Sequence, residues 1–430
     1  MKFHSTRDPS VSTGLSEAIR RGAAPDGGLY LPEEIPAVAP GISANVSLAQ
    51  FATAFLAPYF EGDALQASLG DICAEAMDFA VPAVEADPAR RLSYLELFHG
   101  PTGAFKDFGA RFLMACFDRI GDPAHPLTVL VATSGDTGGA VGCAAEGRSA
   151  VRAVILYPKG RVSPFQERQL TCWGDNVRAL EVDGDFDDCQ RMAKEAFADK
   201  ALSADLNLTS ANSINIGRLL PQAAYIAYAA TRAFEESGEK PGLIIPSGNL
   251  GHGFAAMLAR SMGVPIGPIL LATNENRTLK DWHDSGTYEP RASVETLANA
   301  MDVGNPSNFE RLSALSVRPD DVRVELVSDE QIIARIKAEH DATGYVVCPH
   351  TATTAEAFDR LSDAEKAERP WIAFATAHPF KFAEIVDPLV GAEVEPTPAL
   401  AAIFERATDK REIGPSLSDL SAALREPAAA

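Results

Sequence analysis

Apolar runs separated by glycine-rich turns and helix-periodic segments fill the chain from about residue 91 onward. Four runs of aliphatic and β-branched residues are typical of buried strands. They cover residues 127–132, 151–157, 243–245 and 371–375. Because strands that alternate with helices form parallel sheets covered on both faces, the pattern predicts an α/β fold.

The same pattern divides the chain into three parts. Residues 1–90 have helical spacing interrupted by turns and predict a mainly helical N-terminal domain. Residues 91–240 predict a smaller α/β domain and residues 241–430 a larger one, connected by the alanine- and tyrosine-rich segment 200–240. We therefore expect two open, mostly parallel-sheet domains with helices on both faces and a ligand in the cleft between them.

Composition and charge narrow the class of protein. The 430 residues are 46% hydrophobic and 23% charged, which is typical of a globular protein. A formal net charge of −21 repels phosphodiester backbones and anionic lipids, so we expect neither a nucleic-acid nor a membrane partner. Six scattered cysteines without a CxxC pair, and no leader-like or membrane-spanning run, favour reduced thiols in a cytoplasmic protein.

Lys106 is the first candidate for catalysis. It lies in segment 99–109, where glycines and a proline predict a turn and a helix-periodic run of phenylalanines begins at Phe105. Desolvation and the positive end of the helix dipole both lower the pKa of an amine in such a place. Only the neutral amine attacks a carbonyl, so Lys106 predicts imine chemistry. The alternative is an ordinary solvated lysine at the start of a helix.

Two glycine-rich loops follow predicted strands, at 134–139 and 247–251. Ligands of α/β sheets bind at these strand ends, so two such loops predict a ligand held between two domains. The second loop resembles a phosphate cradle in which backbone N–H groups converge on an anion; it consists of Ser247, Gly248, Asn249, Leu250 and Gly251. The alternative is an ordinary turn with Ser247 as the N-cap of the next helix.

The first loop has an acid beside two hydroxyls, Asp136 with Ser134 and Thr137. Such a group could orient a cofactor hydroxyl or a substrate carboxylate, or it could simply cap the next helix. Thr376 follows the last strong strand, where its hydroxyl could hydrogen-bond a pyridine nitrogen; the alternative is a plain strand-end turn.

Three further residues are candidates for binding an anion in this acidic chain. Asn212 precedes Arg218, and an arginine binds phosphate or carboxylate with two parallel hydrogen bonds. Lys159 follows the strand at 151–157 and is expected at the same sheet edge. The alternative for Arg218 is a surface salt bridge. We expect no metal, because the aspartates at 183–188 lack the glycine and terminal glutamate of a calcium loop, and the histidines have no paired spacing.

Segment 99–109 resembles the lysine segment of the threonine synthases, which are pyridoxal 5′-phosphate enzymes with the tryptophan-synthase-β type of fold (fold type II). Five more segments are similar to motifs of that family and occur in the family's order: 133–138, 212–215, 246–249, 299–303 and 376–379. The resemblance covers nearly the whole chain and points to the longer bacterial and fungal branch. One departure is His252, where an acid or amide is expected after the cradle glycine.

The resemblance implies a role for each candidate. Lys106 would form the Schiff base, the 247–251 loop would hold the cofactor phosphate, and Thr376 would face the pyridine nitrogen. Asp136 would lie near the cofactor ring or its phenolic oxygen. The substrate would contact Ser134, Thr137, Asn212 and Arg218, with Lys159 as a weaker candidate for its phosphate.

The implied enzyme is a carbon–oxygen lyase that acts on O-phospho-L-homoserine. It would release phosphate by γ-elimination and add water at Cβ to give L-threonine, the last step of threonine biosynthesis. Two alternatives remain open from the sequence. One is a serine or threonine dehydratase on the same fold, which would need no second anion site. The other is a binding or regulatory protein that uses no cofactor, against which Lys106 and the two loops argue.

Overall fold

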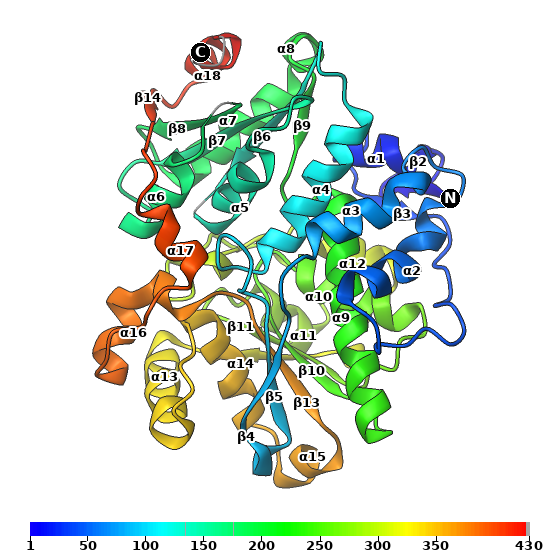
Figure 1. Cartoon of the computed structure of the whole chain (residues 1–430), viewed down its shortest axis with the longest axis vertical. Coiled ribbons are helices and arrows are strands. Elements are labelled where there is room, and N and C mark those ends of the chain that lie inside the picture. The colour runs from blue at the N-terminus through cyan, green and yellow to red at the C-terminus, as the bar shows by residue number, and fades with distance from the viewer. Residues whose placement is uncertain (134, 175, 427–430) are drawn as a thin grey trace.

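The computed structural model describes residues 1–133, 135–174 and 176–426. Figure 1 shows two α/β halves, the smaller above and the larger below, with the N-terminal elements packed along one side. Ser134, one of the candidate residues, lies outside the described residues. Among the described residues, each helix is either too short or too polar to span a membrane.

The smaller half contains a parallel sheet with the strand order β14-β8-β7-β6-β9. Its strands are β6 (Leu127–Ala132), β7 (Val151–Pro158), β8 (Val177–Val182), β9 (Leu208–Ser210) and β14 (Arg411–Ile413). Its helices are α5 (Asp136–Ala145), α6 (Pro164–Thr171), α7 (Phe186–Ala198), α8 (Lys200–Asp205) and α18 (Leu417–Arg425). Both strands expected here, 127–132 and 151–157, are confirmed.

Helices cover both faces of this sheet, as the apolar pattern predicts. Leu130 of β6 packs in one cluster with Met192 of α7, whereas its neighbour Val131 packs in another with Val141 of α5. Alternate residues of a strand point to opposite faces, so a fully apolar strand needs a helix on each side.

The larger half contains the strand order β12-β11-β10-β13-β5-β4, parallel except for β4. Its strands are β4 (Ala83–Asp87), β5 (Leu92–Glu96), β10 (Gly242–Pro246), β11 (Ile269–Thr273), β12 (Arg323–Leu326) and β13 (Trp371–Ala375). Its helices are α10 (Gly251–Ser261), α11 (Thr278–Ser285), α12 (Phe309–Ala314), α13 (Asp329–Thr343), α14 (Pro349–Asp359), α15 (Asp363–Glu368) and α16 (Ala383–Val390). The expected strands 243–245 and 371–375 are confirmed.

Two helices connect the halves. α4 (Lys106–Ile120) follows the end of β5, and α9 (Ile216–Ser237) leads from the smaller sheet to β10. Short helical turns complete the chain: η1 (Gln66–Ser68), η2 (Pro88–Arg90), η3 (Asn299–Met301), η4 (Pro319–Asp321) and η5 (Pro379–Phe382), with α17 (Pro398–Ile403) between the halves near the C-terminus.

The N-terminal part is less helical than its pattern suggests. An antiparallel sheet of β1 (Lys2–Ser5), β2 (Ser12–Gly14) and β3 (Tyr30–Pro32) accompanies α1 (Leu15–Arg21), α2 (Leu48–Phe60) and α3 (Leu69–Ala76). These three helices pack against α4 and α9.

The boundaries expected at 91–240 and 241–430 differ from the sheet pairing in two places. β5 pairs with β13, so the strand before Lys106 belongs to the larger sheet. β14 pairs with β8, so the chain returns to the smaller half near residue 411. Parallel pairing joins segments that are distant in sequence, so local patterning gives no sign of either crossing.

Candidate active site

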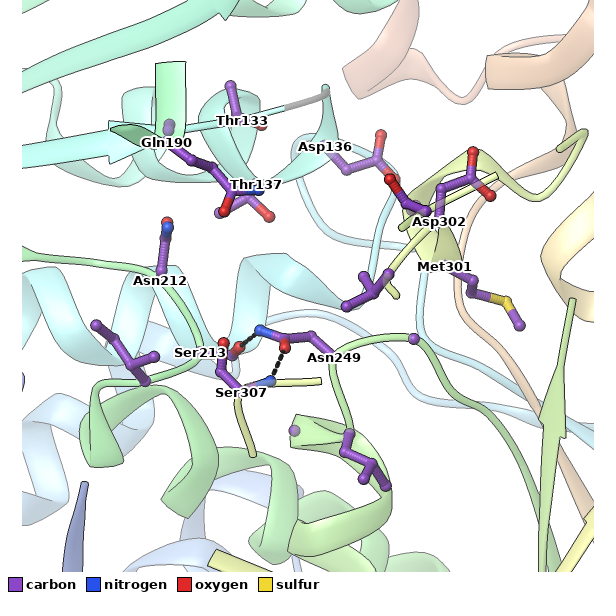
Figure 2. A pocket seen from close by; sticks show the side chains of 18 of the residues that line it. Thr133, Asp136, Thr137, Gln190, Asn212, Ser213, Asn249, Met301, Asp302 and Ser307 are labelled. Carbon is purple, nitrogen blue, oxygen red and sulfur yellow. Dashed lines mark hydrogen bonds between the residues drawn. The ribbon is translucent and has the colours of Figure 1, made fainter. Parts of the chain in front are cut away.

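A cavity of about 580 Å³ lies between the two halves. The smaller half contributes the 135–137 turn and one side of α7, and the larger half contributes the 246–252 turn and the 299–305 segment. Figure 2 shows Thr133, Asp136 and Thr137 on one side of this space and Asn249, Met301 and Asp302 on another. The cleft expected between two α/β domains is therefore present.

Lys106 is the first residue of α4 and lines the cavity. The loop before it is pinned to the segment that follows β13. The Phe105 N–H donates to the Thr376 carbonyl at 2.9 Å, and the His378 N–H donates to the Gly103 carbonyl at 2.9 Å. The segments 103–105 and 376–378, about 270 residues apart in sequence, thus place Lys106 at the cavity between the two halves.

The pKa of Lys106 is lowered to about 8. Removal from water is the main cause, the charge of Asp136 opposes it, and the positive charges of Lys381 and Arg218 act with it. The lowered pKa expected from the sequence, with desolvation as its cause, is confirmed. The alternative of a solvated lysine is wrong. At neutral pH a usable fraction of the amine is neutral.

The turn at 247–251 has an unusual backbone. Leu250 occupies the N-cap position of α10 with a φ of +60°, a left-handed conformation that is rare for a branched side chain. A side chain at Gly248 would place its Cβ only 2.7 Å from the Met301 Cα. Glycine is therefore required here because η3 lies directly over the turn.

The alternative that Ser247 caps α10 is wrong, because the cap is Leu250 and makes no side-chain hydrogen bond. The Ser247 hydroxyl is buried with no hydrogen-bond partner among the described residues. The start of an 11-residue helix, with glycines that let the backbone approach and a free hydroxyl beside them, is suited to a bound phosphate.

Asn249 holds this turn in place. Its amide Nδ2 donates to Ser213 Oγ at 2.7 Å, and its Oδ1 accepts from the Ser307 N–H at 2.5 Å, as the dashed lines in Figure 2 show. The side chain thus ties the turn to the loop before α9 and to the segment before α12.

The 299–303 segment forms the wall over the turn. Asp302 accepts from Thr296 Oγ1 and Asn274 Nδ2, both at 2.7 Å, and burial raises its pKa to about 6. Asn299 lines the cavity, and its Oδ1 has no partner among the described residues. The sequence shows this motif, but nothing local indicates what it does.

Arg218 lies in the first turn of α9 and is buried at the cavity wall. Its Nη1 donates to the Ala211 carbonyl, and its Nε has no partner among the described residues. Burial lowers the pKa of Arg218 to about 10, with Asp107 and Tyr225 opposing. The alternative of a surface salt bridge is wrong. Asn212 and Thr137 line the same cavity.

Asp136 begins α5 and makes a buried ion pair that the sequence does not indicate. Lys381 Nζ lies 2.9 Å from Asp136 Oδ1, with the two side chains 0% and 4% exposed. Burial alone would raise the pKa of Asp136, but the charges of Lys381 and Lys106 outweigh it and hold that pKa below its ordinary value. The N-cap of α5 is Gly135 with no side-chain cap, so Asp136 is more than a capping residue.

Lys159 is not among the residues that line the cavity. Its backbone N–H continues the pairing with β8, and its half-exposed Nζ lies 2.7 Å from Glu412 Oε1. Lys159 does follow the carboxyl end of β7, which is parallel to β6, so it lies at the expected sheet edge. Its side chain is nevertheless outside the cavity, where it pairs with Glu412 of β14. Two cations not identified from the sequence, Lys194 and Arg291, do line the cavity.

Two buried histidines also face this space. His252 stacks on Phe105 with ring centroids 4.9 Å apart, and burial lowers its pKa to about 3. His350 Nε2 accepts from the Ala300 N–H at 3.1 Å, and burial lowers its pKa to about 4. A neutral ring that accepts at Nε2 carries its hydrogen on Nδ1, and that atom has no partner among the described residues.

These groups match what a phosphorylated pyridine aldehyde requires. A partly neutral lysine is present for the aldehyde, and a helix N-terminus with the unpaired Ser247 hydroxyl is present for the phosphate. Further unpaired polar atoms, Asn299 Oδ1 and His350 Nδ1, remain around the space between them. Such a site between two α/β halves defines a pyridoxal 5′-phosphate-dependent enzyme of fold type II.

Comparison with known proteins narrows the class further. The family described as "Pyridoxal-phosphate dependent enzyme" matches residues 89–376, and "Threonine synthase N terminus" and "Threonine synthase, C-terminal" match residues 2–77 and 351–423. The chain belongs to the threonine synthase family and is a pyridoxal 5′-phosphate-dependent lyase.

Relatives of known name and structure align along almost the full length. The chain is 37% identical to the threonine synthase of Haemophilus influenzae, over 97% of this chain and 96% of the relative. It is similar to the threonine synthase of Brucella melitensis with bound pyridoxal phosphate, with a TM-score of 0.90, 33% identity and 99% of each chain covered. The yeast threonine synthase structure aligns with a TM-score of 0.89 and 31% identity, over 99% of this chain and 98% of that one.

Proposed function

We propose that this chain converts O-phospho-L-homoserine and water to L-threonine and inorganic phosphate. The observation that most supports this is one cavity that combines Lys106 with two separate anion-binding groups. One group is the 247–251 turn at the start of α10, and the other is Arg218 with Asn212. A phosphorylated substrate handled with a phosphorylated cofactor needs both.

The cofactor would be held by Lys106 at its aldehyde carbon and by the 247–251 turn at its phosphate. Thr376, at the end of β13, would accept or donate one hydrogen bond at the pyridine nitrogen, and Asp136 would lie beside the ring. When bound, this group supplies an electron sink that stabilises negative charge at the substrate Cα.

Lys106 is also the base. Its Nζ would remove the proton from the substrate Cα and later return a proton to the product. A pKa near 8 suits both directions, because neither protonation state is strongly disfavoured at neutral pH. Hydrogen bonds between the 103–105 and 376–378 backbone fix the start of α4, and with it the point from which the Lys106 side chain enters the cavity.

The substrate phosphate would bind Arg218 and Asn212, with Thr137 nearer the amino-acid end. The Arg218 guanidinium is planar and deeply buried. It would therefore bind the departing phosphate dianion in one defined position inside the cavity. Lys194 and Arg291 at the cavity wall add positive charge against the net −21 of the chain.

Turnover with different amino acids tests the proposal. The purified protein loaded with cofactor should release equal amounts of threonine and phosphate from O-phospho-L-homoserine, and should turn over threonine and serine at least about a hundredfold more slowly. Formation of keto acids from threonine or serine at a comparable rate would establish a dehydratase instead.

Arg218 and Lys159 offer a matched pair of cations. Arg218→Ala should reduce kcat/KM for O-phospho-L-homoserine by about a hundredfold or more, because a buried phosphate contact is lost. Lys159→Ala should change it less than twofold, because that side chain pairs with Glu412 outside the cavity. Equal losses in the two variants would contradict the assignment of the phosphate subsite.

We place this activity in the cytoplasm. All six cysteines are free thiols, as expected for a protein in a reducing compartment.

A further inference from the structure

A second lysine lies beside the site and takes no part in the function proposed above. Lys381 belongs to η5 in the larger half, and its side chain is completely buried. Its Nζ lies 2.9 Å from Asp136 Oδ1 and donates to the Thr102 carbonyl at 2.9 Å. It does not line the cavity, so it acts through its neighbours.

Lys381 joins three segments that meet at Lys106. Asp136 begins α5 in the smaller half, Thr102 belongs to the loop before Lys106, and Lys381 itself follows the strand that leads to Thr376. Thr102 is fixed in turn, since its N–H and Oγ1 donate to the Asp107 carboxylate at 2.9 and 2.6 Å. Movement of any one segment would stretch the Lys381 contacts.

In this network two lysines compete for one carboxylate. One carboxylate, Asp136, is attracted by two lysines, the fully buried Lys381 and the partly buried Lys106. A buried ammonium persists only where an anion or a set of acceptors compensates its lost hydration. Lys381 has both an anion and a carbonyl, whereas no described residue accepts a hydrogen bond from the Lys106 Nζ.

We propose that Lys381 is a positioning residue that keeps the Asp136 carboxylate in a permanent ion pair, so that this carboxylate does not hold Lys106 as an ammonium. The loss of Lys381 would leave Asp136 with only the long hydrogen bond from Gln166 Nε2, at 3.4 Å, and Lys106 would be the remaining lysine whose charge the carboxylate attracts. The amine that attacks the cofactor aldehyde would then be protonated at neutral pH.

The charged and titratable groups that face Lys106 come from four elements. They are Asp136 from α5, Lys381 from η5, Arg218 from α9 and the neutral His350 from α14. Arg218 and Lys381 disfavour the ammonium and Asp136 favours it. Removal of Lys381 therefore acts twice in the same direction, because it deletes a repelling cation and frees an attracting carboxylate.

The inference rests on the role of Lys106 proposed above but not on the identity of the substrate. It is tested on the full-length protein after removal of the cofactor, by labelling with formaldehyde and cyanoborohydride across a pH series. Peptide mass spectrometry measures the fraction of Lys106 that is methylated. The pH at half-maximal rate reports the titration of the Lys106 amine.

Lys381→Gln keeps a hydrogen-bond donor for Thr102 but removes the charge. We expect the midpoint for Lys106 to rise by at least about one pH unit, which lowers its labelling at pH 7 about tenfold. Lys381→Arg should keep the midpoint of the unsubstituted chain. The double variant Lys381→Gln/Asp136→Asn should bring the midpoint back down, because the competing carboxylate is gone.

Lys410→Met is the matched control. Lys410 is also a paired lysine, with Glu167 and Glu181 at 2.5 and 2.8 Å, but its side chain is 41% exposed at the surface of the smaller half. Its removal should leave the Lys106 midpoint unchanged.

A midpoint in Lys381→Gln within about 0.3 pH units of the unsubstituted chain would overturn the inference, as would a rise that Asp136→Asn fails to reverse.

If Lys381→Gln alone does not fold, Lys381→Met is measured in its place, with the same two criteria. If neither single variant folds, the charge-free double variant decides. A Lys106 midpoint at least one unit above that of the unsubstituted chain would then contradict the role given to Asp136, and one at or below it would support that role. Because no substrate is present, a failed shift concerns Lys381 only and leaves the proposed reaction untouched.

Discussion

The two glycine-rich turns that face each other across the cavity have similar sequences but are held in different ways. Each follows a central strand and precedes an alanine-rich helix. The 135–137 turn of the smaller half is held by a charged side chain, because Asp136 forms an ion pair with Lys381 of the larger half. The 247–251 turn of the larger half is held mainly by its backbone, through the φ of +60° at Leu250 and the close packing of Gly248 against η3.

The difference matches the two tasks that the site needs. A phosphate that stays bound through every turnover is best held by fixed N–H groups and a helix dipole, which require no side-chain rearrangement. The charge beside the reacting lysine must instead be set by side chains, since their partners determine protonation. Two turns of similar sequence thus have different roles. The 247–251 turn is suited to bind an anion, and the 135–137 turn sets the charge beside Lys106.

The largest effect on stability is expected at the charged turn. Asp136→Asn leaves Lys381 as a buried cation without its anion, which costs about 3–5 kcal/mol in the free energy of unfolding. Urea denaturation of the cofactor-free protein measures this loss. Asp284→Asn breaks an ion pair with Lys280 that is slightly shorter, at 2.7 Å, but lies on the surface, and should cost less than about 1 kcal/mol. Equal costs would remove the distinction between the two pairs.

The next effect is expected at the backbone-held turn. Gly248→Ala would place a Cβ 2.7 Å from the Met301 Cα and 3.1 Å from its carbonyl carbon, neither of which can move freely. We expect a loss of about 1–3 kcal/mol in stability, together with weaker cofactor binding measured by fluorescence titration.

Gly70→Ala is the control for this substitution. Gly70 lies in α3 with nothing within 4 Å of an added Cβ, so the change should be neutral or stabilise the helix by up to about 1 kcal/mol. A Gly248→Ala protein that binds cofactor as tightly as the Gly70→Ala protein would show that η3 does not constrain the turn.

The smallest effect is expected at Asn249. Asn249→Ala removes the hydrogen bonds to Ser213 and Ser307 and should lower stability by about 1 kcal/mol, since part of this network is accessible to water. Cofactor affinity should fall by less than in Gly248→Ala, because the backbone of the turn remains. A larger fall would mean that Asn249 contacts the cofactor directly.

The strands of the fold were predictable where they are continuous and apolar. Runs such as 127–132 lie in the middle of a sheet covered on both faces, so every position is apolar and the signal is strong. The N-terminal strands have only three or four residues, and β1 and β2 have partly exposed side chains, so their pattern cannot be distinguished from the surrounding turns. The pairing of β5 and β14 depends on contacts between distant segments, which no local pattern contains.

The same distinction holds for the site. Lys106 and the two turns were identifiable because each combines a reactive or flexible residue with a strand or helix end. Lys381 was missed, since a lysine between Phe380 and Phe382 looks like any amphipathic turn until Asp136 is brought beside it. Lys159 follows the carboxyl end of β7 as expected but lies outside the cavity, because its side chain pairs with Glu412 of β14, a contact between segments that are distant in sequence.

The central claim is that Lys106 carries the cofactor. Borohydride reduction of the loaded protein followed by peptide mapping tests it most directly, because reduction fixes the cofactor to the lysine that binds it. We predict that the pyridoxyl phosphate label is found on the peptide with Lys106 and that Lys106→Ala abolishes both the label and the visible absorbance. A label on Lys381, Lys159 or any other lysine, or an unchanged visible band in Lys106→Ala, would contradict the account.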